Sequence, residues 1–177
     1  MTTQVIEKTA WWKVALVTIP VIVGLGSLSG LLSNSGFGNP WFDNVEKPAF
    51  MPPGWVFGAT WTTLYTLMGI ALAIVWTAPE GRPRSLGLAL FAVQLALNYA
   101  WSPIFFGAGA IDWAFVVIMA MNVLVTATII VFWRVKWVAG ALLLPYLAWL
   151  CLATALNHEI GRLNPGADRA SLGITGD

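Results

Sequence analysis

The sequence predicts an all-α membrane protein, a bundle of five transmembrane helices. Hydrophobic residues make up 58% of the chain and charged residues only 10%, whereas a soluble domain carries roughly 25% charged residues. The apolar residues fall into five runs, each long enough to cross a hydrocarbon core of about 30 Å as a helix that rises about 1.5 Å per residue. All but one of the connections between these runs are short.

The first apolar run covers residues 14–32 and follows a polar N-terminal segment, residues 1–13. A cleaved signal peptide is the competing interpretation. The run is long for the apolar part of a signal peptide, and no A-x-A-type cleavage site follows it. We therefore expect a retained first helix. Pro20 can kink this helix, because neighbouring helices tolerate such a kink in a membrane.

Four further apolar runs predict helices over residues 56–76, 86–106, 113–133 and 137–157. Prolines and charges mark the turn before the third helix. Only three residues separate the fourth helix from the fifth, which leaves room for a tight antiparallel turn. One transmembrane domain, residues 14–157, would contain all five helices. We expect the polar C-terminal tail, residues 158–177, to be frayed.

The connection over residues 33–55 is too long and too specific to be a simple turn. Its central part reads NPWFDNVEKPAFMPPGW and lies between the first two helices. Its four prolines restrict φ, so we expect a stiff course without helix.

The basic residues are unequally divided between the two sides of the membrane. The side of the N-terminus has six, Lys8, Lys13, Arg82, Arg84, Arg134 and Lys136, and the opposite side has three, Lys47, Arg162 and Arg169. The positive-inside rule therefore predicts a cytoplasmic N-terminus and a C-terminus outside.

Several classes of function find no support in the sequence. The net charge of +1 provides no basic field for nucleic acid. Cys151 is the one cysteine, which excludes an intrachain disulfide, and a single histidine leaves no plausible zinc site. We expect Cys151 to be a small buried side chain. No catalytic triad, intramembrane carboxylate pair, phosphate loop or nucleotide-cofactor fingerprint is present, so no cofactor is required.

The eleven tryptophans are the most unusual part of the composition. Membrane proteins place tryptophan at both interfaces, which accounts for most of them. Trp61, Trp101 and Trp149 instead lie inside predicted helices, and Trp41 lies in the long loop. Counted from the helix ends, the three helical tryptophans and Asn98 share one layer in the outer half of the membrane. The long loop is on that same side.

The third predicted helix has two distinct faces. One carries Gln94, Asn98, Trp101, Ser102 and Phe105 at helical spacing. It should face the bundle interior, because an unpaired amide in hydrocarbon costs several kcal/mol. Hydrogen bonding between helices is the alternative to ligand binding for these amides, and the two are evenly balanced. The opposite face carries Ala92, Ala96 and Ala100, a small-residue repeat that allows close packing within the bundle or in a dimer.

Two further aromatic stripes lie at the same depth. They are Phe57, Trp61, Tyr65 and Met68 on the second helix, and Tyr146, Trp149, Ala153 and Asn157 on the fifth. Aromatic stripes usually form core. Three of them together with amides indicate a pocket for a flat, largely apolar ligand with a few polar groups.

Three motifs resemble one known family. The stretch WFDNVEKPAFMPPGWVFGATWTTLY begins at Trp41, NYAWSPIFF begins at Asn98, and PYLAW begins at Pro145. In this order on five spans they resemble the tryptophan-rich sensory protein and translocator protein family, also called peripheral-type benzodiazepine receptors. The likeness covers roughly residues 40–164.

The resemblance implies a five-helix bundle, commonly a homodimer, whose first loop is a lid over a ligand pocket. Ligands of the family include protoporphyrin, haem-like tetrapyrroles and benzodiazepine-type drugs. The resemblance thus implies an integral membrane receptor, carrier or sensor that takes porphyrin or haem as its ligand. Carried over by motif, and with Phe57 added from its stripe, the ligand-binding residues are Trp41, Phe42, Phe57, Trp61, Tyr65, Asn98, Trp101, Trp149 and Ala153.

Two alternative functions follow from the same residues. Some bacterial members of the family are associated with light- and oxygen-dependent breakdown of porphyrin, for which Trp61 and Trp149 would be the catalytic residues. A non-catalytic scaffold that assembles through the alanine face is the other alternative.

The sequence departs from the family pattern at two places. Phe50 replaces the tryptophan of the usual K-P-x-W-x-P-P motif, which keeps an aromatic ring but removes an N–H donor. His158 stands where the sterol-associated pattern needs tyrosine, and that pattern is weak even when intact. Animal members of the family bind cholesterol, but here we do not expect it.

Overall fold

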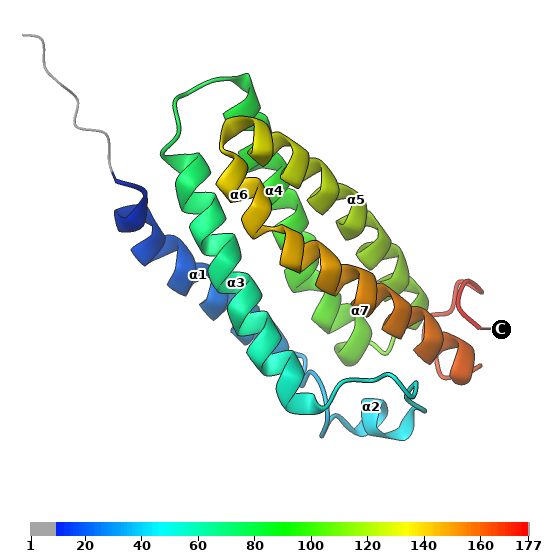
Figure 1. Ribbon diagram of the computed structural model, residues 1–177. Coiled ribbons are helices and arrows are strands. Elements are labelled where there is room, and N and C mark those ends of the chain that lie inside the picture. The colour runs from blue at the N-terminus through cyan, green and yellow to red at the C-terminus, as the bar shows by residue number, and fades with distance from the viewer. Residues whose placement is uncertain (1–9, 177) are drawn as a thin grey trace, which may run out of the picture.

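Five long helices form an elongated bundle (Figure 1). The structure, a computed structural model, describes residues 10–176. Five segments are long and apolar enough to cross a membrane, which confirms the predicted fold class: Trp11–Leu32, Gly54–Trp76, Arg82–Gly107, Ile111–Val135 and Trp137–Leu163. Most of the predicted N-terminal polar segment, including Lys8, lies outside the described residues.

The helices extend beyond several of the predicted bounds. Three spans are single helices, α1 (Trp11–Leu32), α3 (Gly54–Trp76) and α5 (Ile111–Val135). The third span is α4 (Arg82–Ser102) followed by a π-helical turn, η1 (Pro103–Gly107). The fifth span is α6 (Trp137–Leu142) followed by α7 (Leu144–Leu163). The long loop contains a short helix, α2 (Pro40–Asn44), so the prediction that this loop has no helix is wrong.

Prolines explain both irregular spans. Pro103 has no N–H, so it leaves the carbonyl of Tyr99 without its usual donor and the helix opens into a π-helical turn. The hydroxyl of Ser29 on α1 donates to that carbonyl at 2.6 Å. Pro145 lies in the first turn of α7, directly after the break at Leu143 that separates α7 from α6.

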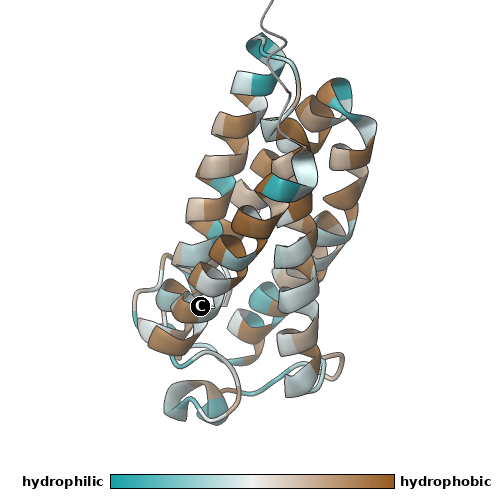
Figure 2. Cartoon of the chain, turned by 90° about the vertical axis from the view of Figure 1, so that its left-hand side faces the viewer, coloured by the Kyte–Doolittle hydropathy of each residue, from teal (hydrophilic) through white to brown (hydrophobic). Residues whose placement is uncertain are grey.

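The helices pack as neighbours around a central core. α1 packs along α3, α4 packs along α5, and α5 also packs along α7 and α6. Hydrophobic residues occur along the whole length of the helices (Figure 2). Large apolar side chains such as Leu16, Val123 and Ile130 are exposed on the outside of the bundle, where hydrocarbon replaces water as the solvent.

The alanine face of α4 and the side chain of Cys151 both lie on the outer surface of the bundle. Ala92 and Ala96 are exposed and Ala100 is half-buried, so the alanine face lies on the outside of the bundle and is available for a dimer. Cys151 is exposed too. The prediction that Cys151 is buried is wrong, because it lies on the outward face of α7.

The C-terminal tail is ordered, contrary to the prediction that it is frayed. α7 continues to Leu163, and the rest of the tail folds back over the start of α5. There the buried carboxylate of Asp112 accepts hydrogen bonds from the backbone N–H groups of Leu172, Ile174 and Thr175. The hydroxyls of Ser171 and Thr175 also donate to it. Residues 171–175 are therefore fixed by one carboxylate.

α1 is held against α3 by a close backbone approach at Gly69. The hydroxyl of Thr18 donates to the Gly69 carbonyl at 2.8 Å. A Cβ at position 69 would lie 2.8 Å from the Cα of Ile19, which is closer than van der Waals contact allows. The absence of a side chain therefore permits this helix pair.

We expect Gly69→Ala to lower the free energy of unfolding by about 1–3 kcal/mol, because backbone atoms must separate to admit the methyl group. Thermal unfolding in detergent measures the change. Gly24→Ala is the control, since a Cβ at position 24 of α1 meets nothing within 4 Å. Equal stability of Gly69→Ala and Gly24→Ala would contradict tight packing at this contact.

Candidate ligand pocket

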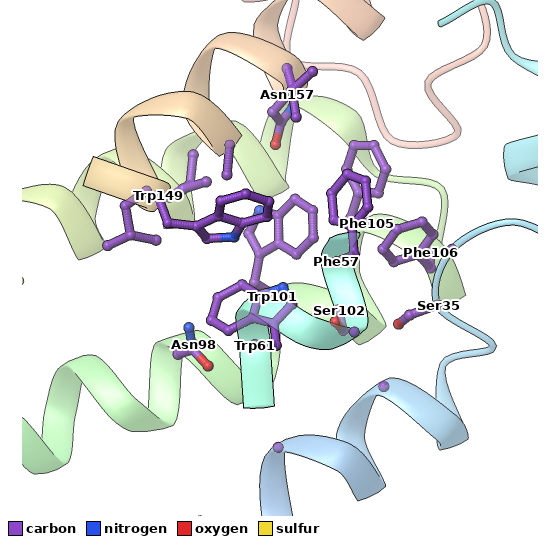
Figure 3. Close-up of a pocket in the computed structure, with 18 of the residues that line it drawn as sticks. Ser35, Phe57, Trp61, Asn98, Trp101, Ser102, Phe105, Phe106, Trp149 and Asn157 are labelled. Atoms are coloured by element: carbon purple, nitrogen blue, oxygen red, sulfur yellow. The ribbon is translucent and has the colours of Figure 1, made fainter. Parts of the chain in front are cut away.

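A cavity of about 470 Å³ lies inside the bundle, at the end covered by the long loop. Ligand pockets commonly have volumes of about 300–1,000 Å³. The lining comes from α1, the long loop, α3, α4, η1, α5 and α7, so residues far apart in the sequence form one site (Figure 3).

Aromatic rings form the walls of the cavity (Figure 3). Phe57 of α3 meets Trp149 of α7 edge to face, with ring centroids 5.6 Å apart. Trp101 of α4 stacks on Phe105 of η1 at 4.8 Å. Trp61 of α3 completes the set. Such surfaces suit a flat aromatic ligand, because offset and edge-to-face contacts between rings are favourable.

A chain of buried hydrogen bonds joins the three helices that bear these rings. The hydroxyl of Tyr65 on α3 donates to Asn98 Oδ1 on α4 at 2.8 Å. Asn98 Nδ2 donates to the hydroxyl of Tyr146 on α7 at 3.0 Å, and that hydroxyl donates to Gln94 Oε1 at 3.0 Å. Asn98 therefore lines the cavity while both polar atoms of its amide bond to other helices. Of the two roles considered for this amide, the geometry favours the link between helices.

The indole N–H groups differ in what they bond. Trp101 Nε1 donates to the carbonyl of Ala114 at 3.1 Å. Within residues 10–176, the indole nitrogens of Trp61 and Trp149 donate to no protein group, although both rings line the cavity. These two donors are available to a ligand.

The structure brings most of the predicted ligand-binding residues together. Those that line the cavity are Phe42, Phe57, Trp61, Tyr65, Asn98, Trp101, Trp149 and Ala153. Trp41 does not line it. Its ring packs edge-on against Phe105 at 5.4 Å, and its Nε1 donates to the carbonyl of Ala167 in the tail at 3.3 Å. Trp41 thus holds the loop in place from behind the cavity, and its role as a ligand contact stays a prediction.

Sequence reasoning missed the contribution of α1 to the cavity. Gly26, Ser27 and Gly30 line it, and the ring of Tyr65 occupies the space that a side chain at position 26 would need. The spacing of these small residues was the available signal. Asn157 of α7 also lines the cavity, and its place in the aromatic stripe of the fifth predicted helix was the signal for it.

The long loop is the lid of the cavity, and the tail fastens it. Asn39 caps α2 by accepting from the N–H groups of Trp41 and Phe42, which turns the Phe42 ring toward the cavity. Asn164, just after α7, bonds the backbone of Glu46 twice: its Oδ1 accepts from the N–H at 2.6 Å and its Nδ2 donates to the carbonyl at 2.9 Å.

Comparison with known proteins agrees with this architecture. The sequence profile of the TspO/MBR family matches residues 16–163. The chain belongs to the TspO/MBR family. This membership confirms the resemblance seen in the three motifs, and with the five spans it makes the chain an integral, multi-pass membrane protein.

Relatives from distant organisms are similar over most of the chain. The translocator protein of Homo sapiens is 40% identical over 144 residues, which cover 80% of this chain and 85% of the human protein. The protein CrtK of Rhodobacter capsulatus is 43% identical over 127 residues, 71% of this chain and 79% of that protein. The tryptophan-rich sensory protein of Cereibacter sphaeroides is 44% identical over 124 residues, 70% and 77% of the two chains.

The link between Asp112 and the tail can be tested by hydrogen exchange. In Asp112→Asn one carboxylate oxygen becomes an NH₂ donor, so tail N–H groups lose their acceptor. We expect amide exchange at Leu172, Ile174 and Thr175 to become roughly tenfold faster, as the loss of one charge-assisted hydrogen bond implies. Glu80→Gln is the control, since that carboxylate is exposed between α3 and α4. Unchanged protection in Asp112→Asn would mean that other contacts hold the tail.

Proposed function

We propose that this TspO/MBR family member is a membrane receptor, carrier or sensor that binds a tetrapyrrole, protoporphyrin or haem, in the cavity beneath the lid. The observation that carries the proposal is the cavity itself, about 470 Å³ with tryptophans from three helices around it. Benzodiazepine-type drugs, which are also flat and aromatic, would occupy the same space.

The polar groups of the cavity are compatible with this class of ligand. A porphyrin presents a wide aromatic face and carboxylates on its edge. The faces of Trp61, Trp101 and Trp149 can contact the ring, and the two available indole N–H groups can donate to carboxylate oxygens. No metal or further cofactor is needed for such binding.

The rest of the proposal concerns assembly and orientation. The exposed alanine face of α4, formed by Ala92, Ala96 and Ala100, is the proposed dimer interface, because small residues let two helices approach closely. We place the N-terminus in the cytoplasm and the lid outside, as the distribution of basic residues implies.

We expect Trp149→Phe to weaken protoporphyrin binding about three- to tenfold, because the ring remains but its N–H donor is lost. Trp149→Ala also removes the wall and should weaken binding further. Titration in detergent, followed by tryptophan quenching and porphyrin absorbance, measures the affinity. Trp137→Phe is the control, since Trp137 is exposed at the other end of the bundle. Wild-type affinity in both Trp149 variants would rule out this cavity as the binding site.

A second candidate function is the light- and oxygen-dependent degradation of porphyrin. The observation that favours it is the position of Trp61 and Trp149, two oxidisable indoles that line the same cavity. Dissolved O₂ would be the oxidant.

Under illumination in air, we expect Trp61→Phe and Trp149→Phe to slow the loss of the porphyrin absorbance band at least about tenfold, a change of about 1.4 kcal/mol in barrier. Trp101→Phe is the matched control within the cavity, because its N–H is already bonded to Ala114. Bleaching at the wild-type rate in both variants would exclude catalysis by these indoles and leave binding as the function.

A further inference from the structure

One buried polar atom in the cavity has no partner. Asn157 of α7 is 1% exposed, and its Nδ2 donates to the carbonyl of Ile111, the first residue of α5, at 3.0 Å. Among the buried side-chain nitrogens and oxygens of residues 10–176, Asn157 Oδ1 is the one atom without a hydrogen bond. An unpaired buried acceptor is unfavourable and rare in folded proteins.

The orientation of this amide is fixed by its neighbour. A backbone carbonyl can only accept, so the NH₂ group of Asn157 must be the group that meets Ile111. The oxygen is consequently on the other side of the amide, directed toward the aromatic rings of the cavity (Figure 3). Rotation of the amide by 180° would break the bond to Ile111 without giving the oxygen a donor from α5.

The surroundings of Asn157 Oδ1 provide no donor from the protein. Leu156, Ile160 and Ala153 line the adjacent wall with apolar groups. Trp101 of α4 already donates its N–H to the carbonyl of Ala114. The indole N–H groups of Trp61 and Trp149 also lie in the lining of the cavity, but neither donates to Asn157 Oδ1. The cavity therefore offers a ligand one fixed acceptor as well as two donors.

We propose that Asn157 Oδ1 accepts a hydrogen bond from the bound ligand, so that the cavity selects flat aromatic molecules with an N–H or O–H donor on their edge. The inference rests on the proposed function, that this cavity binds a ligand, and specifies the chemistry of that ligand. The O–H of a protonated propionic acid on the edge of a porphyrin meets the requirement, as does a lactam N–H or a ring hydroxyl. The same molecule with a methyl group on that nitrogen or oxygen cannot donate, and its methyl group would face a buried oxygen.

A matched pair of ligands tests the proposal. Phenanthridinone is a flat tricyclic lactam with one edge N–H, and its N-methyl derivative has the same rings without the donor. Both are measured as competitors of protoporphyrin on the full chain in detergent. We expect wild-type protein to prefer the N–H form about three- to tenfold, the difference that one neutral hydrogen bond makes.

Variants at position 157 test whether the preference for the N–H lactam comes from the side-chain oxygen of Asn157. We expect Asn157→Leu, or Asn157→Ala if the leucine variant does not fold, to bind the two lactams equally. Asn157→Asp retains an acceptor and should keep the preference for the N–H form. Asn122→Leu is the control. Asn122 also links α5 to α7, through Thr154, but it does not line the cavity.

The outcomes separate this inference from the proposed function. If protoporphyrin does not bind wild-type protein, the proposed function and this inference fall together. If protoporphyrin binds but the lactams do not compete, or compete equally, this inference alone is overturned. Persistence of the N–H preference in Asn157→Leu and Asn157→Ala would also overturn it.

Discussion

The buried hydrogen bonds among Tyr65, Asn98, Tyr146 and Gln94 are the constraint on which the cavity depends. Hydrocarbon offers no partner for an amide or a hydroxyl, so these groups must find one another. In doing so they fix α3, α4 and α7 relative to each other in the middle of the bundle. On one side of this network the side chains pack into a core. On the other side the same three helices supply tryptophans to a cavity, whose dimensions follow from the positions that the network imposes.

The closed end of the cavity depends on contacts between segments far apart in the chain. The lid is fastened by Asn164, which bonds Glu46, and by Trp41, which bonds the tail at Ala167. The tail is held in turn by the carboxylate of Asp112 at the start of α5. Lid, tail and α5 therefore form one connected structure at the end of the cavity, and a change in any of these contacts would reach the lid through the others.

Much of the site could be predicted because helix periodicity and depth are local properties of a sequence. The spacing of Asn98 and Trp101 gave their common face, and distance from the helix ends placed Trp61 and Trp149 at one depth. The hydrogen bonds between Asp112 and the tail could not be predicted, because the groups that donate to Asp112 are mainly backbone N–H groups, which no residue pattern marks. The position of Trp41 behind the cavity could not be predicted for a similar reason, because a loop has no periodicity from which the direction of a side chain follows.

The most direct test is a structure of the protein bound to protoporphyrin in a membrane mimetic. It shows whether the helices that the buried hydrogen bonds join enclose the ligand. We expect the macrocycle to lie beneath α2, in contact with Trp61 and Trp149, with the hydrogen bonds of Asn98 to Tyr65 and Tyr146 unchanged. A macrocycle bound on the outer face of α4, or one that enters the bundle only after the bonds of Asn98 are broken, would contradict it.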